Sequence, residues 1–230
     1  MSQHWAVIPV KGLLDSKKRL SSYLGDNKKL LVEALLHDVL SSAFQSNMYD
    51  KILVISPDDH VAVQARMNKA AFVKQTSFGL NHAVEQANRL AQRENVLSLT
   101  TILADIPLAE PRDFRELLSL GDEGRKVVIA PSLKGGTNVM ITRPPGAVRP
   151  SYGRWSYSKH LRQAQLDGIT LYSISNPRLS FDIDTVDDLN ELKRRDLDLR
   201  TASGRALSRL GPRPKIDESF TAKRCLLIIG

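Results

Sequence analysis

Cysteine is almost absent from this chain of 230 residues, which has one, Cys225. A single thiol cannot close an internal disulfide, and it cannot build a cysteine-rich zinc site. This excludes a disulfide-stabilised secreted scaffold and fits a reducing compartment.

Long apolar runs are also absent. No stretch reaches the roughly 18 apolar residues that a membrane-spanning helix needs. The start, MSQHWAVIPVKG, lacks the basic, apolar and small-residue order of a signal peptide. We therefore expect a cytoplasmic protein with no membrane partner.

Negative charge is in deficit, since the formal net charge is +8. Between Lys193 and Arg224 ten basic residues stand against four acidic ones, and the remainder is nearly balanced. Aromatic residues, on which bases would stack, do not interleave with this basic stretch. We therefore expect no nucleic-acid partner, and read residues 196–230 as a solvated or subunit-contacting basic tail with an apolar end, CLLIIG, that could support a homodimer. Residues 1–195 would form the main domain.

The apolar pattern alternates between short continuous runs and longer helical repeats. This alternation is typical of strands and crossover helices in a mainly parallel sheet, so the sequence predicts an α/β fold with flanking helices. Strands are predicted at residues 5–10, 51–57, 71–75, 99–108, 126–132, 137–145, 169–175 and 179–184. Helices are predicted at 28–44, 58–68, 80–95, 110–120, 156–168 and 185–195.

The stretch LSFDIDTVDDL concentrates acidic residues in a basic chain. In an extended segment alternate side chains share a face, so Asp182 and Asp184 would point one way while Phe181 and Ile183 point into a core. Two adjacent carboxylates repel each other. A metal ion or a basic side chain should therefore lie against them.

Two further stretches follow buried strands. Ligands of open α/β sheets bind beyond the carboxyl ends of the strands. In PVKGLLDSKKRL, Lys11 and Arg19 would lie where a polyphosphate binds, although a solvated basic loop explains them equally well. In ILADIPL, Asp105 emerges at a strand end, where it could be a simple terminator or join Asp182 and Asp184 around Mg²⁺.

Three glycine-containing motifs could bind anions, and each has a plainer interpretation. KGGTN exposes backbone amides, or forms an ordinary hairpin turn. In YGRWSYSKH, Gly153 and Ser156 precede a helix whose N-terminus favours anions, or Ser156 is an N-cap. In SFGLNHA, Gly79 could be a loop glycine and Asn81 a cap.

Taken in order, PVK…KKRL, GLNHA, ADIPL, GGTN, YGRWSYSKH and FDIDTVDDL resemble the 2-phospho-L-lactate and phosphoenolpyruvate guanylyltransferases of coenzyme F-420 biosynthesis, over residues 5 to about 194. The resemblance implies a Rossmann-like fold of the nucleotide-diphospho-sugar transferase kind. It implies that GTP and a phosphorylated three-carbon acid give a GMP-linked phosphodiester and pyrophosphate. The acid would be 2-phospho-L-lactate, phosphoenolpyruvate or 3-phospho-D-glycerate, and the product would pass to a deazaflavin transferase.

The family pattern also implies roles for residues of this chain. Asp105, Asp182 and Asp184 would bind Mg²⁺, while Lys11 and Arg19 would face the GTP phosphates as the catalytic cations. The remaining implied contacts are with guanine, by Gly79, Leu80 and Asn81, and with the acid, by Thr137, Gly153 and Ser156.

The sequence leaves two rival functions open. One is a nucleotidyltransferase of the same fold with another acceptor, such as a molybdenum-cofactor guanylyltransferase or a cytidylyltransferase. The other is a non-catalytic nucleic-acid-binding protein that uses the basic tail, a reading that leaves the three aspartates without a role.

Overall fold

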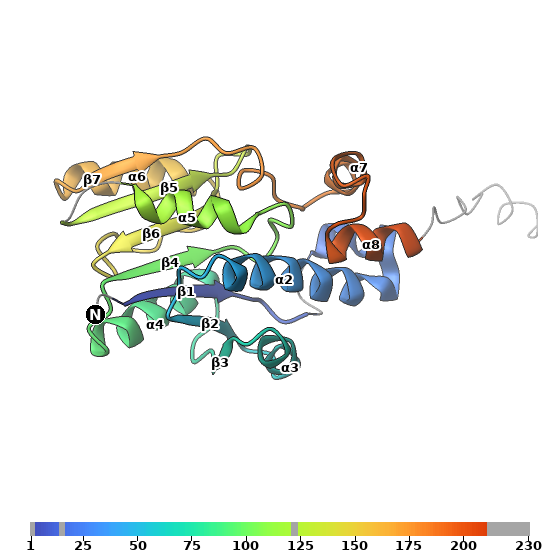
Figure 1. Ribbon diagram of the computed structural model, residues 1–230, viewed down its shortest axis with the longest axis horizontal. Helices are drawn as coiled ribbons and strands as arrows, with labels where there is room; N and C mark the ends of the chain where they lie inside the picture. The colour runs from blue at the N-terminus through green and yellow to red at the C-terminus, as the bar shows by residue number, and fades with distance from the viewer. Residues whose placement is uncertain (1–2, 14–16, 121–123, 211–230) are drawn as a thin grey trace, which may run out of the picture.

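A seven-stranded sheet forms the centre of the computed structural model, in the order β3-β2-β1-β4-β6-β5-β7 (Figure 1). The structure describes residues 3–13, 17–120 and 124–210. β1 pairs in parallel with β2 and β4, β2 with β3, and β5 with β7, while β6 runs antiparallel to β4 and β5. The predicted mainly parallel sheet is confirmed. The strands are β1 His4–Pro9, β2 Lys51–Ser56, β3 Ala71–Lys74, β4 Ser98–Ile102, β5 Lys126–Pro131, β6 Thr137–Arg143 and β7 Thr170–Ser173.

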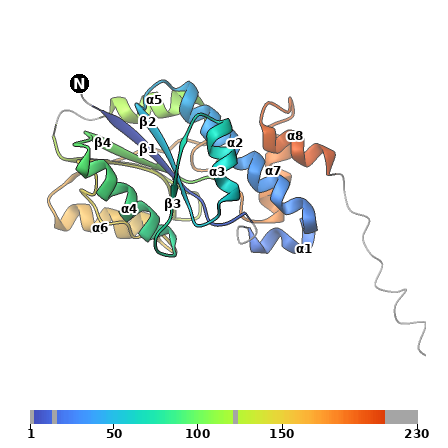
Figure 2. The same cartoon turned by 90° about the horizontal axis from the view of Figure 1, so that it is seen from below.

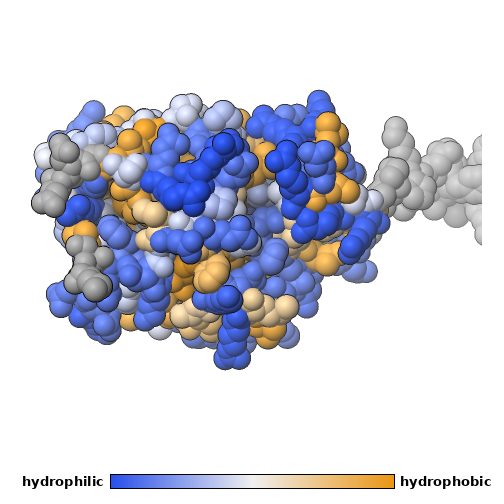
Figure 3. Space-filling view, in the orientation of Figure 1, coloured by the Kyte–Doolittle hydropathy of each residue, from blue (hydrophilic) through white to orange (hydrophobic). Residues whose placement is uncertain are grey.

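Helices cover both faces of the sheet (Figures 1 and 2). Helices α2, α3 and α5 pack on one face and α4 and α6 on the other. On the face in Figure 3, hydrophobic residues form scattered patches among hydrophilic ones. The helices are α1 Ser21–Leu24, α2 Lys28–Gln45, α3 His60–Met67, α4 Leu80–Arg93, α5 Pro111–Ser119, α6 Ser156–Leu166, α7 Val186–Arg195 and α8 Ala202–Arg209, with short 3-10 turns η1 Lys18–Leu20 and η2 Gly25–Asn27.

The largest cluster of buried side chains explains why these helices dock. β1 contributes Ala6 and Ile8, α2 contributes Leu36, and α5 contributes Phe114, all fully buried. Burying a side chain such as Phe114 stabilises the fold by about 1.5–3 kcal/mol relative to leaving it exposed. Within the described ranges no helix combines the length and apolarity that crossing a membrane requires.

A smaller cluster lies at the carboxyl edge of the parallel strands. It joins α1, α7 and α8 to one end of α2, through side chains such as Leu35, Phe181, Leu192 and Leu207. α8 is fixed to α2 because Asp38 accepts hydrogen bonds from the first two amides of α8, at 2.6 and 2.9 Å. The expected tail is thus packed as far as residue 210. The rest of it, with CLLIIG, lies outside the described residues, so the division at residue 195 stays a prediction.

Two strand predictions are wrong, one in its extent and one altogether. β4 ends at Ile102, so the chain leaves the sheet before it reaches Asp105, and residues 103–108 are not part of the strand. Residues 179–184 form no strand, because their backbone bonds to loops instead of to a sheet edge: Ile183 N–H donates to Asp105 O at 3.0 Å, and Leu133 N–H donates to Ser180 O at 3.1 Å. The segment therefore lies between the loop after β4 and the β5–β6 turn.

Candidate active site

The side chains of residues 181–184, which we call the acidic segment, alternate in direction as predicted. Phe181 and Ile183 are buried in the cluster that joins α1, α7 and α8 to α2. Asp182 and Asp184 project to the opposite side, toward Asp105 and two lysines. The three aspartates thus meet at the carboxyl edge of the sheet, where open α/β proteins bind their ligands.

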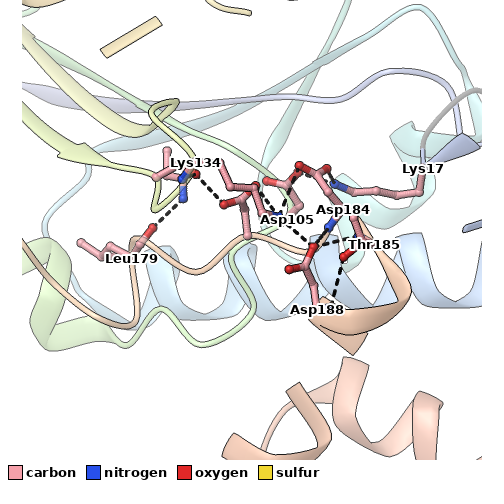
Figure 4. Close-up of polar contacts among 10 residues, drawn as sticks. Lys17, Asp105, Lys134, Leu179, Asp184, Thr185 and Asp188 are labelled. Carbon is pink, nitrogen blue, oxygen red and sulfur yellow. Dashed lines mark hydrogen bonds and ion pairs between the residues drawn. The ribbon is translucent and has the colours of Figure 1, made fainter. Parts of the chain in front are cut away.

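Lys17 lies between two of the aspartates (Figure 4). Its Nζ donates to Asp105 Oδ2 and, at 2.9 Å, to Asp184 Oδ1. Burial acts to lower the pKa of Lys17, but the two carboxylates outweigh it and raise that pKa above its ordinary value. Lys17 therefore remains an ammonium ion that neutralises part of the acidic cluster.

Lys134, from the β5–β6 turn, approaches the cluster from the other side. Its Nζ lies 2.8 Å from Asp188 Oδ2, 3.8 Å from Asp182 Oδ2 and 3.9 Å from Asp184 Oδ2. Burial lowers the pKa of Lys134, yet these acids raise it overall. Asp188 also accepts the amide of Thr185 at the start of α7, so it is a helix-capping residue, as expected for an acid in a first turn.

The Asp182 side chain is buried beside Ser132. Its Oδ1 accepts a hydrogen bond of 2.7 Å from the Ser132 hydroxyl, which favours the carboxylate. Burial outweighs this hydrogen bond and, together with the nearby Asp105 charge, raises the pKa of Asp182 to about 6. The pKa of Asp184 moves the other way: burial raises it, but Lys17 holds it below its usual range.

These contacts identify the positive charge that the sequence requires. The sequence predicts either a metal ion or a basic side chain against Asp182 and Asp184, and basic side chains lie there. The donor set also has the chemistry of a magnesium site, since Mg²⁺ prefers carboxylate oxygens. Asp105 Oδ1 is buried and has no hydrogen-bond partner among the described residues, so it could take such an ion. In the described part no three His, Cys, Asp or Glu side chains are already grouped around a metal position, and the magnesium assignment stays a prediction.

The residues expected to bind the acid gather around the Gly135–Gly136 turn, which closes the β5–β6 hairpin. Thr137 follows this turn and begins β6. Tyr157 N–H, at the start of α6, donates to Gly135 O at 3.3 Å, and Ser156 N–H donates to Gly153 O at 3.1 Å. We call Thr137, Gly153 and Ser156 the acid site. The structure brings them close together, while their role stays a prediction.

Ser156 is not the N-cap of α6. That position is Trp155, in a left-handed conformation with φ 59°, and Ser156 is the first helical residue, buried at 2% exposure. The Trp155 ring lies over Gly135, where an added Cβ would be 2.8 Å from it. Glycine is therefore required at 135 by this contact and by its φ of 78°.

Asn81 connects α4 to the loop before the acid site. Its Oδ1 accepts the Tyr152 amide at 2.7 Å, and its Nδ2 donates to Tyr152 O at 3.4 Å. Asn81 is therefore not a helix cap, and the N-cap of α4 is Gly79. The predicted contacts of Gly79, Leu80 and Asn81 with guanine stay predictions.

Lys11 and Arg19 are exposed at the same edge of the sheet. Their side chains take no part in the ion pairs described above, which are made by Lys17 and Lys134. Sequence reasoning missed these two lysines and Ser132. The need for a cation beside the aspartates was a signal for a lysine, but nothing in the sequence identified which one.

Three comparisons place the chain among known proteins. A family model described as guanylyl transferase CofC like matches residues 4–202. The phosphoenolpyruvate guanylyltransferase of Rubrobacter xylanophilus is 37% identical over 191 residues, which cover 82% of this chain and 93% of that one. The 3-phospho-D-glycerate guanylyltransferase of Colwellia psychrerythraea is 33% identical over 189 residues (81% and 89%). The 2-phospho-L-lactate guanylyltransferase of Methanocaldococcus jannaschii is 30% identical over 188 residues (81% and 80%).

The solved structures bear on the fold. A protein from Desulfovibrio desulfuricans G20, described as a nucleotide-diphospho-sugar transferase, aligns with a TM-score of 0.71 at 17% identity, covering 91% of this chain and 95% of that one. The predicted Rossmann-like, nucleotide-diphospho-sugar transferase fold is thereby confirmed.

Proposed function

The chain belongs to the guanylyl transferase CofC like family, and from this premise we propose that it transfers GMP from GTP to a phosphorylated three-carbon acid and releases pyrophosphate. The observation that carries the proposal is the family match over residues 4–202. Relatives named for phosphoenolpyruvate, 2-phospho-L-lactate and 3-phospho-D-glycerate all align over 81% or more of the chain. We further propose that the product serves coenzyme F-420 biosynthesis and passes to a deazaflavin transferase.

The proposed reaction requires no general base. The phosphate of the acid has a second pKa of about 6 and is mostly a dianion at neutral pH. One of its oxygens forms a bond to the α-phosphorus of GTP, and the bond from that phosphorus to the bridging oxygen of the β-phosphate breaks. Pyrophosphate leaves with the bonding electrons. The protein has to position the two anions and offset their combined charge.

Three sets of residues would help to offset that charge. Asp105, Asp182 and Asp184 would hold Mg²⁺, which when bound neutralises phosphate oxygens and orients them. Lys11 and Arg19 lie beyond the end of β1 and would face the GTP phosphates, as the sequence predicts. Lys17, already an ammonium ion within the acidic cluster, adds a third cation at this edge.

The other contacts would select the substrates. Gly79, Leu80 and Asn81 would lie beside the guanine, at the start of α4. Thr137, Gly153 and Ser156 would hold the acid, with backbone amides near Gly135 available to its carboxylate or phosphate. The comparisons favour neither a nucleic-acid-binding protein nor a transferase for another class of acceptor.

Pyrophosphate release tests the proposal. The protein is incubated with GTP and Mg²⁺ and with each of the three acids in turn, and a deazaflavin transferase is added to remove the product. We expect release with at least one acid and none without acid; phosphoenolpyruvate, for which the relative with 37% identity is named, is the first to test. Replacing GTP by ATP or CTP gives the nucleotide preference. If no acid supports release with any nucleoside triphosphate, the proposed function is wrong.

A further inference from the structure

His160 contacts Thr137 of the acid site without being one of the site's predicted members. It is on α6, one turn after Ser156, and it is fully buried. One ring nitrogen, Nε2, accepts the Ser151 amide at 2.9 Å, and the other, Nδ1, lies 3.0 Å from Thr137 Oγ1. The ring of Tyr152 packs edge-on against it, with centroids 5.1 Å apart. His160 therefore connects β6 to the loop that carries Gly153.

The hydrogen bonds fix the state of the imidazole ring. A backbone amide can only donate, so Nε2, which accepts from Ser151, carries no proton. The proton of the neutral ring is then on Nδ1, which donates to Thr137 Oγ1. Burial lowers the pKa of His160 to about 4, so this neutral form persists at neutral pH.

This arrangement determines what the Thr137 hydroxyl can do. Because its oxygen accepts from His160, its own hydrogen points elsewhere and can be donated to a second acceptor. Thr137 directly follows the Gly135–Gly136 turn, beside which Ser156 also lies. The Thr137 side chain is buried in the structure, and an anion that reached it at this turn would meet its hydroxyl as a donor.

The same ring holds the other part of the acid site. Ser151 and Tyr152 precede Gly153, and their amides are held by His160 Nε2 and by Asn81 Oδ1, respectively. Gly153 itself has φ 116°, a conformation that favours glycine. His160 thus holds the positions of Thr137 and of the loop before Gly153 with one side chain.

We propose that His160 is a positioning residue for the acid substrate: it presents the Thr137 hydroxyl as a donor to the phosphorylated acid and fixes the Ser151–Gly153 loop around it. The proposal rests on the proposed guanylyl transfer and adds a residue that acts through Thr137 without contacting the substrate.

Steady-state kinetics of His160→Phe test this role. The substitution keeps a buried ring but removes both hydrogen bonds. We expect the KM for the acid to rise at least about tenfold, equivalent to the loss of about 1.4 kcal/mol of binding free energy, while the KM for GTP stays within about twofold of the parent value. A rise of both KM values by the same factor would show a merely structural role and overturn the proposal.

The matched control is His4→Phe. His4 is also a partly buried histidine that bonds a hydroxyl, with Nδ1 2.6 Å from Ser98 Oγ, but it lies at the opposite edge of the sheet. We expect it to lower the melting temperature and leave both KM values unchanged. A change in the acid KM as large as that of His160→Phe would contradict the proposal.

Two further measurements keep the test decisive if His160→Phe does not fold. His160→Gln can keep an acceptor for Ser151 but loses the donor to Thr137, whereas His160→Asn can keep the donor; the first should raise the acid KM more. Combining His160→Gln with Thr137→Val should raise the acid KM little beyond either change alone, because each change already removes the hydrogen bond from His160 to Thr137. Fully additive effects would overturn the proposal. A parent protein that releases no pyrophosphate would instead show that the proposed function has failed.

Discussion

Replacing Arg178 tests how much the Arg178–Asp113 ion pair contributes to holding the acidic segment in place. Asp113, on α5, has a fully buried side chain, and Arg178 donates to both of its carboxylate oxygens, with Nε 2.9 Å from Oδ2. Asn176 Nδ2 and the Glu110 amide also donate to it, at 2.9 and 2.8 Å. The turn at residues 176–180, which leads into Asp182, is therefore held on α5 by one buried carboxylate.

Arg178→Met would leave that carboxylate buried without its cation. Breaking a buried pair in this way costs about 3–5 kcal/mol, and the two remaining donors place the expected loss near 3 kcal/mol. For a domain of this size that corresponds to a fall in melting temperature of about 6–12 °C. Urea unfolding and calorimetry at pH 7.5 measure both quantities. Arg194→Met, at an exposed arginine paired with Glu191, is the matched control and should cost less than about 1 kcal/mol.

The pH dependence supplies a second test. Burial raises the pKa of Asp113, but Arg178 and the other donors lower it below its usual value in the folded parent. This stabilisation is present above the unfolded pKa of about 3.9 and is lost as the pH falls. Without Arg178, burial should raise the pKa of Asp113, so the variant should lose more stability at pH 7.5 than at pH 4.5. Adding Asp113→Asn to Arg178→Met should then recover stability at pH 7.5. A cost below about 1 kcal/mol for Arg178→Met, or a double variant less stable than the single one, would refute the reasoning.

Three other variants test separate contacts. Asp184→Asn should reduce turnover by more than about a hundredfold while destabilising the protein by less than about 1 kcal/mol, because its side chain is 40% exposed. Asp187→Asn, an exposed neighbour, is the control, and near-parent turnover of Asp184→Asn would exclude the proposed role of Asp184 in holding Mg²⁺. Asp38→Asn should cost about 1–3 kcal/mol by weakening the link between α2 and α8, seen as a lower urea midpoint, and an unchanged midpoint would contradict this. Gly135→Ala should cost about 1–3 kcal/mol through its positive φ and its clash with Trp155; Trp155→Ala should relieve part of that cost, and no relief would show that the clash is absent.

The order of strands and helices could be predicted from the sequence because hydrophobic periodicity is a local property. The segment at residues 179–184 shows the limit of that signal. Side chains alternate in direction along any extended segment, as Phe181 and Ile183 do with the aspartates between and after them, whether or not the segment pairs in a sheet. Here Ile183 N–H donates to Asp105 O, and Ser180 O accepts from Leu133 N–H. These bonds to loops replace the bonds to a neighbouring strand, and they join distant parts of the chain.

The candidate site was predictable to a similar extent. The shared face of Asp182 and Asp184 followed from local geometry, as did the need for a positive partner. The identity of that partner did not, because Lys17 is 88 residues from Asp105 and 167 from Asp184 in the sequence. Ser156 illustrates a different limit: its position suggested a cap, but the left-handed Trp155 shifts the helix start by one residue.

The reversed direction of β6 has a consequence for how this protein could evolve. Because β6 runs against β4 and β5, the turn at residues 132–136 lies where β4 ends. That one turn carries Ser132 and Lys134 to the aspartates and Gly135 to the acid site. An insertion or deletion there would alter the charge balance and the acid site in a single step. A lineage that changes its acid should therefore do so through residues 149–155, whose contacts run to Asn81 and His160, while the length of the turn is inherited unchanged.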